Sequence, residues 1–249
     1  MFLCRKWLNF KNKTKYLATV LKQSVMKKTF ILLLTFGLFI TALAQETKPV
    51  SKNKPSEDVT NLQLANDLAR YGFKTFSADA LIQAAKIMGS VKTQDLKYES
   101  FKQEPAPKEQ ATKKSNEGYD LASILAAAKK YADGDPKLLA SIAEIEKANQ
   151  ATRGRVGGPG EKYAYAYGNT TDTYEINFIA GRLAEISVSG DGDTDLDLYV
   201  YDSNLNIVAE DADYTDKCYV SWVPAWTGKF IVRIANRGPI LNKYHLVTN

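Results

Sequence analysis

The chain changes its hydrophobic periodicity near residue 161, and this change limits its architecture more than any other feature. Between residues 58 and 150, apolar side chains recur at the spacing of one helical face. Between residues 162 and 249, apolar and polar side chains alternate over short runs that turn-forming residues separate. Most of these runs start ten to twelve residues apart, which is typical of a β-sandwich. The sequence therefore predicts an α+β protein, with a small four-helix unit before an all-β sandwich or jelly-roll-like domain.

The helical unit is expected to contain two antiparallel α-hairpins. In the first helix, Leu64, Leu68 and Tyr71 recur at helical spacing, and we expect them to form its buried face. Ser77 is placed to cap the second helix, and Pro136 stands where the first turn of the fourth helix tolerates a proline. Core packing explains these apolar faces without a ligand.

Three stretches of the chain have few apolar residues, and we expect them to lack regular structure. Residues 45–57 are polar, contain two prolines and are typical of a flexible leader. Residues from about 92 to 117 are charged, which predicts a mobile insertion within the helical unit of residues 58–150. Residues 151–161 contain four glycines and one proline, which predicts a linker before the domain of residues 162–249.

The first 44 residues have the features of an export signal. Two lysines precede the apolar run Phe30–Ile40, and small residues stand before a cleavage position after Ala44. The apolar run is shorter than the roughly 20 residues of a membrane-spanning helix, so we expect cleavage and no stable membrane span. Met26 begins this complete signal, which indicates that translation starts there and that residues 1–25 are an extension; an unusually long basic segment is the alternative. The mature protein is then expected to be periplasmic or secreted.

Charge is distributed unevenly between this signal region and the rest of the chain. The formal net charge is +5, but eight of the 33 Lys and Arg residues lie in the first 44 positions, which contain no acidic residue. The other 205 residues have 25 basic and 28 acidic side chains. We therefore expect no cationic surface that would attract nucleic acid.

The chain has few residues that support nucleophilic or metal-assisted catalysis. Two cysteines, one of them in the signal region, and a single histidine exclude a disulfide scaffold and most His-based metal sites. After residue 44 the chain has one thiol, Cys218, and one imidazole, His245, which are the residues available for a nucleophile–base pair. Nothing in the sequence indicates that the two side chains lie close together. We therefore expect a protein that is not an enzyme, although two positioned carboxylates would suffice for a small hydrolase.

Four short motifs follow one another along residues 162–249. They are a Gly-Asp turn, an Asp-Leu-Asp strand, a Pro-x-x-x-Gly hairpin and a closing Tyr-x-Leu strand. The residues concerned are Gly190, Asp195, Leu196, Asp197, Tyr199, Asp202, Pro224, Gly228, Phe230, Val232, Tyr244 and Leu246. In these motifs the region, about a third of the chain, resembles a bacterial pre-peptidase C-terminal (PPC) domain. The resemblance implies a β-sandwich module of secreted proteins that usually follows a peptidase and serves in secretion, solubility or substrate binding. Here no peptidase precedes the module, which leaves its target open.

Five aspartates within twelve residues of this region are the candidates for a metal site. They are Asp191, Asp193, Asp195, Asp197 and Asp202. Clustered carboxylates beside turn carbonyls suit calcium, which some members of the resembled family bind. The spacing is not that of an EF-hand, because the sixth position is Leu196 rather than glycine. The alternative is a solvated acidic edge that blocks sheet-to-sheet aggregation, and runs of charge more often have that role.

Aromatic residues are the candidates for contact with a partner. Trp226 lies in a turn beside Pro224, where we expect it to be exposed. Tyr163, Tyr165 and Tyr167 alternate with alanine, and they form either a ladder for a carbohydrate or peptide or a row packed against the helical unit.

Together these features predict an exported, non-enzymatic binding or accessory protein, with calcium as its candidate cofactor. Its expected partner is a protein or a glycan at the cell envelope or exterior, and not nucleic acid. Two other functions stay open: a small secreted hydrolase that uses acidic residues, and a structural envelope component that oligomerises through its helices.

Overall fold

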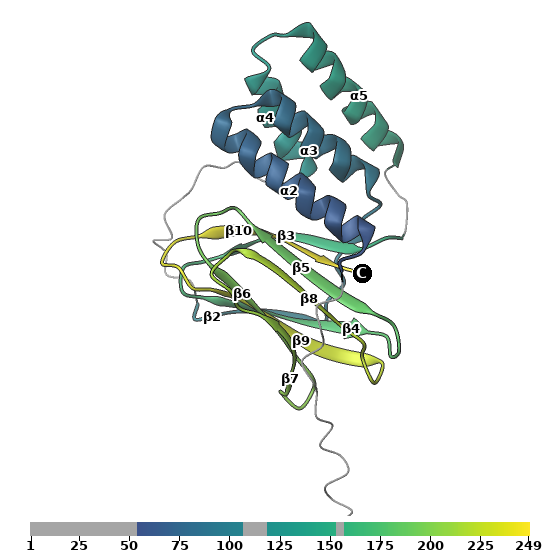
Figure 1. Cartoon of the computed structure of the whole chain (residues 1–249), viewed down its shortest axis with the longest axis vertical. Coiled ribbons are helices and arrows are strands. Elements are labelled where there is room, and N and C mark those ends of the chain that lie inside the picture. Colours follow the sequence, from purple (N-terminus) through teal and green to yellow (C-terminus); the bar gives the residue numbers. More distant parts are fainter. Residues whose placement is uncertain (1–53, 107–118, 153–156) are drawn as a thin grey trace, which may run out of the picture. The chain divides into compact units, whose positions relative to one another are not determined.

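The computed structural model describes residues 54–106, 119–152 and 157–249 (Figure 1). The expected export signal, nearly all of the leader and residues 107–118 of the expected insertion lie outside these ranges. The signal, its cleavage after Ala44 and the start at Met26 therefore stay predictions. Within the described ranges, no helix is both long and apolar enough to cross a membrane.

The described part of the chain contains four helices, as predicted. They are α2 (Glu57–Thr75), α3 (Ala78–Ser90), α4 (Leu121–Tyr131) and α5 (Pro136–Thr152). Ser77 caps α3 by accepting a hydrogen bond from Ala80 N at 3.2 Å. Asp120 caps α4 by accepting one from Ser123 N at 3.0 Å. Both caps satisfy backbone amides that the start of a helix leaves without partners.

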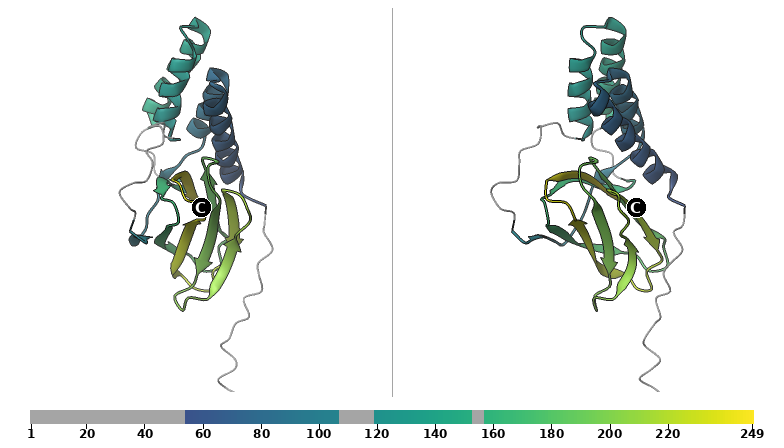
Figure 2. Two further views of the ribbon diagram at one scale, coloured as in Figure 1. Left: turned by 90° about the vertical axis from the view of Figure 1, so that its left-hand side faces the viewer. Right: turned by 60° about the vertical axis from the view of Figure 1, so that its left-hand side comes forward.

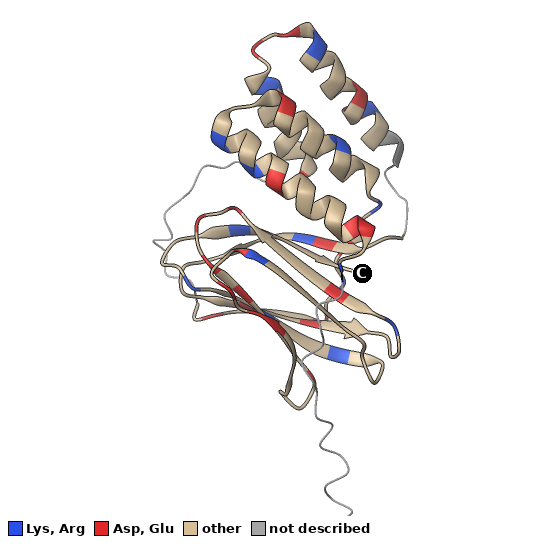
Figure 3. Ribbon diagram, viewed as in Figure 1, with Lys and Arg blue, Asp and Glu red and all other residues tan. Residues whose placement is uncertain are grey.

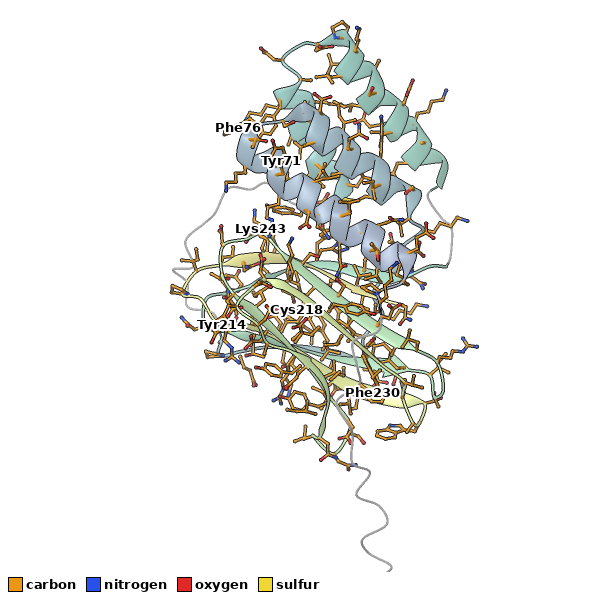
Figure 4. All side chains as sticks on the ribbon, in the orientation of Figure 1. Tyr71, Phe76, Tyr214, Cys218, Phe230 and Lys243 are labelled. Carbon is orange, nitrogen blue, oxygen red and sulfur yellow. The ribbon has the colours of Figure 1, made fainter. Side chains whose placement is uncertain are left out.

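The buried face of α2 differs from the predicted one. Leu68 packs partly against the helical core, but Leu64 and Tyr71 are 49% and 59% exposed (Figure 4). The buried residues are Val59, Leu62, Ala65, Asn66, Ala69 and Gly72. Small residues prevail because α2 passes close to α3: a Cβ at Gly72 would lie 2.7 Å from Leu81 Cδ2. Leu64 and Tyr71 therefore point outward, and the small residues of the buried face permit the close crossing.

Ten strands form a β-sandwich, which confirms the predicted fold class. The first sheet has the order β1-β3-β10-β5-β8 and the second the order β2-β4-β9-β6-β7. The strands are β1 (Gln94–Asp95), β2 (Ser100–Glu104), β3 (Gly160–Ala166), β4 (Thr171–Phe178), β5 (Ala184–Gly190), β6 (Leu196–Tyr201), β7 (Ile207–Asp211), β8 (Lys217–Trp222), β9 (Gly228–Asn236) and β10 (Asn242–Thr248).

The sandwich core lies between the two sheets and follows the predicted alternation. Leu196, Leu198 and Val200 of β6 are fully buried there. Val232 of β9 is also fully buried, and Phe230 of the same strand is 1% exposed. Burial of alternate apolar side chains from both sheets supplies the main stabilising term of such a layer pair.

The segment expected to be a mobile insertion contributes strands to both sheets, so that prediction is wrong for its described part. β1 pairs in parallel with β3 at one edge of the first sheet, and β2 pairs antiparallel with β4 at one edge of the second. These short edge strands are held mainly by backbone hydrogen bonds, which composition does not reveal. The expected linker is also shorter than residues 151–161, because α5 continues to Thr152 and β3 begins at Gly160.

The helices pack on the outer face of the first sheet (Figure 2). Tyr219 of β8 and Val247 of β10 belong to the hydrophobic cluster of the helices rather than to the sandwich core. The two predicted units thus share a hydrophobic cluster within the one compact unit that spans residues 49–249.

Candidate binding cleft

The outer face of the first sheet is polar, and α2 covers it with polar side chains. Gln63 Nε2 donates to Ser187 Oγ at 2.9 Å, and Lys217 Nζ forms an ion pair with Asp67 Oδ1 at 2.6 Å. Farther along the helix, Arg70 Nη1 pairs with the buried Asp216 at 3.2 Å. Buried polar groups on a sheet require such partners, because an unpaired group costs about 1–3 kcal/mol.

His245 of β10 lies at the centre of this polar layer and is 1% exposed. Asn66 Nδ2 lies 3.0 Å from its Nδ1, and Glu161 Oε2 lies 2.9 Å from its Nε2. The Tyr163 ring stacks on the imidazole with 4.0 Å between ring centroids and an interplanar angle of 10°. Both ring nitrogens are engaged, so His245 positions its neighbours rather than meeting a ligand.

The Asn66 amide gives the Nδ1 atom of His245 a hydrogen-bond partner. As placed, Asn66 Nδ2 donates to Nδ1, and the Nε2–H of the imidazole donates to Glu161. Asn66 Oδ1 is buried and has no hydrogen-bond partner among the described residues. The two contacts fix the orientation of the imidazole ring.

Glu161 of β3 is held as a carboxylate. Burial alone would raise the pKa of Glu161, but the hydrogen bond and charge of His245 outweigh it and lower that pKa. Thr93 strengthens the effect, since its Oγ1 donates to Glu161 Oε1 at 2.5 Å, and Tyr163 also hydrogen-bonds to this carboxylate. Burial raises the pKa of Tyr163 well above its ordinary value, and the charges of Glu161 and Asp120 raise it further, so the phenol stays a donor.

A cleft of about 840 Å³ opens beside this group, where the end of α3, β1, the start of α4 and β3 meet. Its lining includes the side chains of Lys92, Asp95, Tyr98, Asp120, Lys162 and the Glu161–Tyr163 pair. Lys162 Nζ lies 5.2 Å from the centroid of the partly exposed Tyr98 ring. This size and this mixture of aromatic, anionic and cationic groups are typical of a ligand site.

Three of the five predicted calcium aspartates have other partners in the structure. Asp197 pairs with Arg237, and Asp202 accepts hydrogen bonds from the amides of its own turn, including Asn204 N at 2.8 Å. The Asp191 carboxylate accepts from Lys243 N at 3.1 Å. Among the described residues, no three His, Cys, Asp or Glu side chains lie where they would hold a metal ion. Calcium therefore stays a prediction from the sequence.

Asp193 and Asp195 lie in the same β5–β6 loop. Asp193 N donates to Asp191 Oδ1 at 3.3 Å. The pKa of Asp195 is raised, first by burial and then by the charge of Asp197. The charge of Arg237 lowers this pKa, but burial and the neighbouring acids together raise it more.

The four predicted aromatic contacts fall in separate places. Tyr163 lines the cleft, while Tyr165, on the same face of β3, is half exposed outside it. Tyr167 follows the end of that strand. Trp226 lies in the β8–β9 loop, where its ring stacks on Phe230 with centroids 5.5 Å apart. They do not form one ligand surface.

Sequence reasoning missed most of the cleft. Thr93 and Tyr98 belong to the segment expected to be mobile, and no sequence motif singles out Asp120. Cys218 is buried in the sandwich core (Figure 4), whereas His245 lies on the opposite face of the first sheet. Burial raises the pKa of the Cys218 thiol far above its ordinary value, so the thiol is neither paired with the imidazole nor nucleophilic.

Comparisons with known proteins give a partial likeness of fold. No family model matches the chain, and no curated protein matches it. Among solved structures, the pre-peptidase C-terminal domain of a Bacillus anthracis collagenase is 16% identical, with a TM-score of 0.30, over 38% of this chain and 92% of that one. A periplasmic inhibitor of g-type lysozyme from Aeromonas hydrophila is 14% identical, with a TM-score of 0.29, over 36% and 84%. A mitogen from Yersinia pseudotuberculosis is 12% identical, with a TM-score of 0.26, over 38% and 86%.

A PPC domain is thus among the structures similar to this chain, in line with the resemblance of its C-terminal motifs. At these scores the likeness carries no argument about function, which must come from the cleft itself.

Proposed function

We propose that this chain is an exported binding protein that holds a glycan in the cleft between α3, β1, α4 and β3. The observation that carries the proposal is that Tyr98, Glu161 and Lys162 line one cleft of about 840 Å³, in which Lys162 Nζ lies 5.2 Å from the centroid of the Tyr98 ring. Export rests on the signal pattern of the first 44 residues.

The chemistry of the cleft suits a sugar. One face of a sugar ring carries C–H groups that pack against an aromatic ring such as Tyr98. Its hydroxyls donate to carboxylates such as Glu161 and accept from ammonium groups such as that of Lys162. Glu161 is oriented by Thr93 and His245 before any ligand arrives, which reduces the ordering cost of binding.

The state of Glu161 supports binding rather than glycoside hydrolysis. A general acid needs a proton at the working pH, and the hydrolases that use two carboxylates raise the pKa of that acid. In this cleft the pKa of Glu161 is lowered. The carboxylate therefore serves as a hydrogen-bond acceptor.

Calorimetry with soluble oligosaccharides tests the proposal, using a panel that includes N-acetylglucosamine oligomers, cello-oligosaccharides and malto-oligosaccharides. We expect binding by the wild-type chain and a loss of about tenfold in affinity for Tyr98→Ala, because the stacked ring contributes roughly 1.4 kcal/mol. Glu161→Gln should weaken binding as well, since it removes the charged acceptor. Tyr165→Ala is the matched control, because Tyr165 is an exposed tyrosine of β3, the strand that contains Glu161, and it lies outside the cleft.

Two outcomes would contradict this proposal. Equal affinities of the wild type and Tyr98→Ala would place any sugar outside the cleft. Release of shorter oligosaccharides by the wild type but not by Glu161→Gln would instead identify the protein as the small hydrolase.

A further inference from the structure

Three loops leave the sandwich at the same end. They connect β4 to β5 (179–183), β6 to β7 (202–206) and β8 to β9 (223–227), and we call them the tip loops (Figure 1). Phe178 of β4 is paired with Gly228, and Tyr201 of β6 with Ile231, so two of these loops leave the sheet on either side of the start of β9.

Backbone contacts hold two of the tip loops together. Gly181 N donates to Pro224 O at 2.9 Å, and Ala180 N donates to Thr227 Oγ1 at 2.9 Å. The Trp226 ring rests on Phe230, a residue of the sandwich core. The tips are therefore ordered before they meet a partner, which lowers the entropy cost of docking.

The tip loops expose large apolar side chains to solvent. Five of these side chains are between 38% and 59% exposed, namely Ile179, Leu183, Leu205, Val223 and Trp226. They stand on three separate turns, and other residues line the cleft between α3, β1, α4 and β3. An apolar group of this kind on projecting turns marks an interaction surface.

Charge is divided between the two ends of the sandwich. Arg182 and Asp202 are the charged residues in the sequence of the three tip loops. Strand β6 runs from the opposite end, where the loops of residues 191–195 and 212–216 contain five aspartates. Figure 3 shows a basic residue at the β4–β5 turn and acidic residues along the loops at the other end. The Asp202 side chain is buried, and its carboxylate accepts hydrogen bonds from amides of its own turn.

We propose that the tip loops dock on an anionic lipid bilayer. Apolar side chains on the turns enter the boundary between headgroups and acyl chains, with the Trp226 ring at the depth that indoles prefer. The guanidinium of Arg182 meets lipid phosphates at the membrane surface. The apolar stem of the side chain can lie among the lipid while the charged group stays at the polar boundary. The acidic loops face away from the membrane, because a negative surface repels them.

A bilayer fits these tips better than a protein partner does. A protein interface of standard size has a continuous, closely complementary surface with regular hydrogen bonds. The tips instead present convex apolar points with one cation, and a deformable interface accommodates such points without a matching shape.

Vesicle binding tests this inference, with the full chain and vesicles of phosphatidylcholine alone or mixed with phosphatidylglycerol. We expect co-sedimentation that increases with phosphatidylglycerol, and quenching of Trp226 emission by brominated acyl chains. The triple variant Ile179→Ser, Leu205→Ser, Val223→Ser should bind vesicles at least about tenfold more weakly than the wild type, since membrane affinity scales with buried apolar area. Arg182→Gln should reduce the preference for phosphatidylglycerol.

The matched control is Leu64→Ser with Tyr71→Ser, which removes exposed apolar side chains from α2 and leaves the tips intact. All variants share the same N-terminal segment, so differences among them report on the tips, and circular dichroism checks their folding. Equal vesicle binding by the tip variant and the control would overturn the proposal, as would an absence of binding by the wild type. If the wild type bound a purified protein partner but no vesicles, and the tip variant did not bind that partner, the tips would be assigned to a protein interface instead.

Discussion

At the residue scale, two buried carboxyl groups of the sandwich differ because their donors differ. Glu161 receives hydrogen bonds from His245 and Thr93, and its pKa is lowered. Asp172 of β4 is fully buried, and burial raises its pKa to about 6 although Tyr244 and Gln103 hydrogen-bond to it. The Tyr244 hydroxyl lies 2.6 Å from Asp172 Oδ2. Burial prevails at Asp172 because neutral donors replace the solvation of a charge only in part.

Asp172 should make the stability of the protein depend on pH. Its pKa is 3.8 ordinarily and about 6 in the folded state, so the folded state binds the proton more tightly. The stabilising contribution is complete below pH 3.8 and is lost as the pH rises through about 6. In Asp172→Asn this contribution, about 2 to 3 kcal/mol, should disappear from the pH profile of the unfolding free energy. Urea denaturation from pH 4 to pH 7 measures it, and parallel profiles for variant and wild type would contradict the assignment.

At the element scale, α2 is a helix with two buried sides of different chemistry. Its small residues meet α3, where Gly72 lies against Leu81, and its polar residues meet the first sheet, where Asn66 lies against His245. The large apolar residues that sequence periodicity assigned to the interior, such as Leu64, face solvent instead. Periodicity locates a bulky stripe, but here the crossing distance between helices decided which stripe was buried.

Removal of the Asn66 side chain should loosen the contact between α2 and the first sheet. Asn66→Ala leaves His245 Nδ1 buried without its partner, so we expect a loss of about 1–2 kcal/mol in the free energy of unfolding. Leu64→Ala on the exposed side of the same helix should change it by less than about 0.5 kcal/mol. Urea denaturation of both variants measures the difference. Equal losses for the two would show that the Asn66–His245 contact contributes nothing specific.

At the scale of the whole described chain, the helices and the sandwich are joined by shared packing. Tyr219 and Val247 of the sheet lie in the hydrophobic cluster of the helices, and Ser56 N donates to Glu185 Oε1 at 2.9 Å. A boundary drawn from composition near residue 161 therefore separates two kinds of secondary structure rather than two independent folding units.

Unfolding should accordingly be one cooperative transition. Because α2 contacts both α3 and the first sheet, the loss of either layer exposes the other. We expect thermal melting followed by far-ultraviolet circular dichroism, which reports on the helices, to coincide with melting followed by fluorescence of the buried Trp222. Two separate midpoints would show that the helices and the sandwich unfold independently.

The sequence by itself determined the class of the helices and of the strands after residue 160. The alternation around Leu196 and Phe230 and the helical spacing before residue 150 depend on neighbouring residues alone, so they predicted the helices and the sandwich. The tertiary structure alone decided the rest. The pairing of Gln94 with Gly160, the meeting of Asn66 with His245 and the cleft beside Glu161 join residues far apart in the chain. Such contacts leave no periodic trace, because each is made by the packing of whole elements and not by the preference of any one segment.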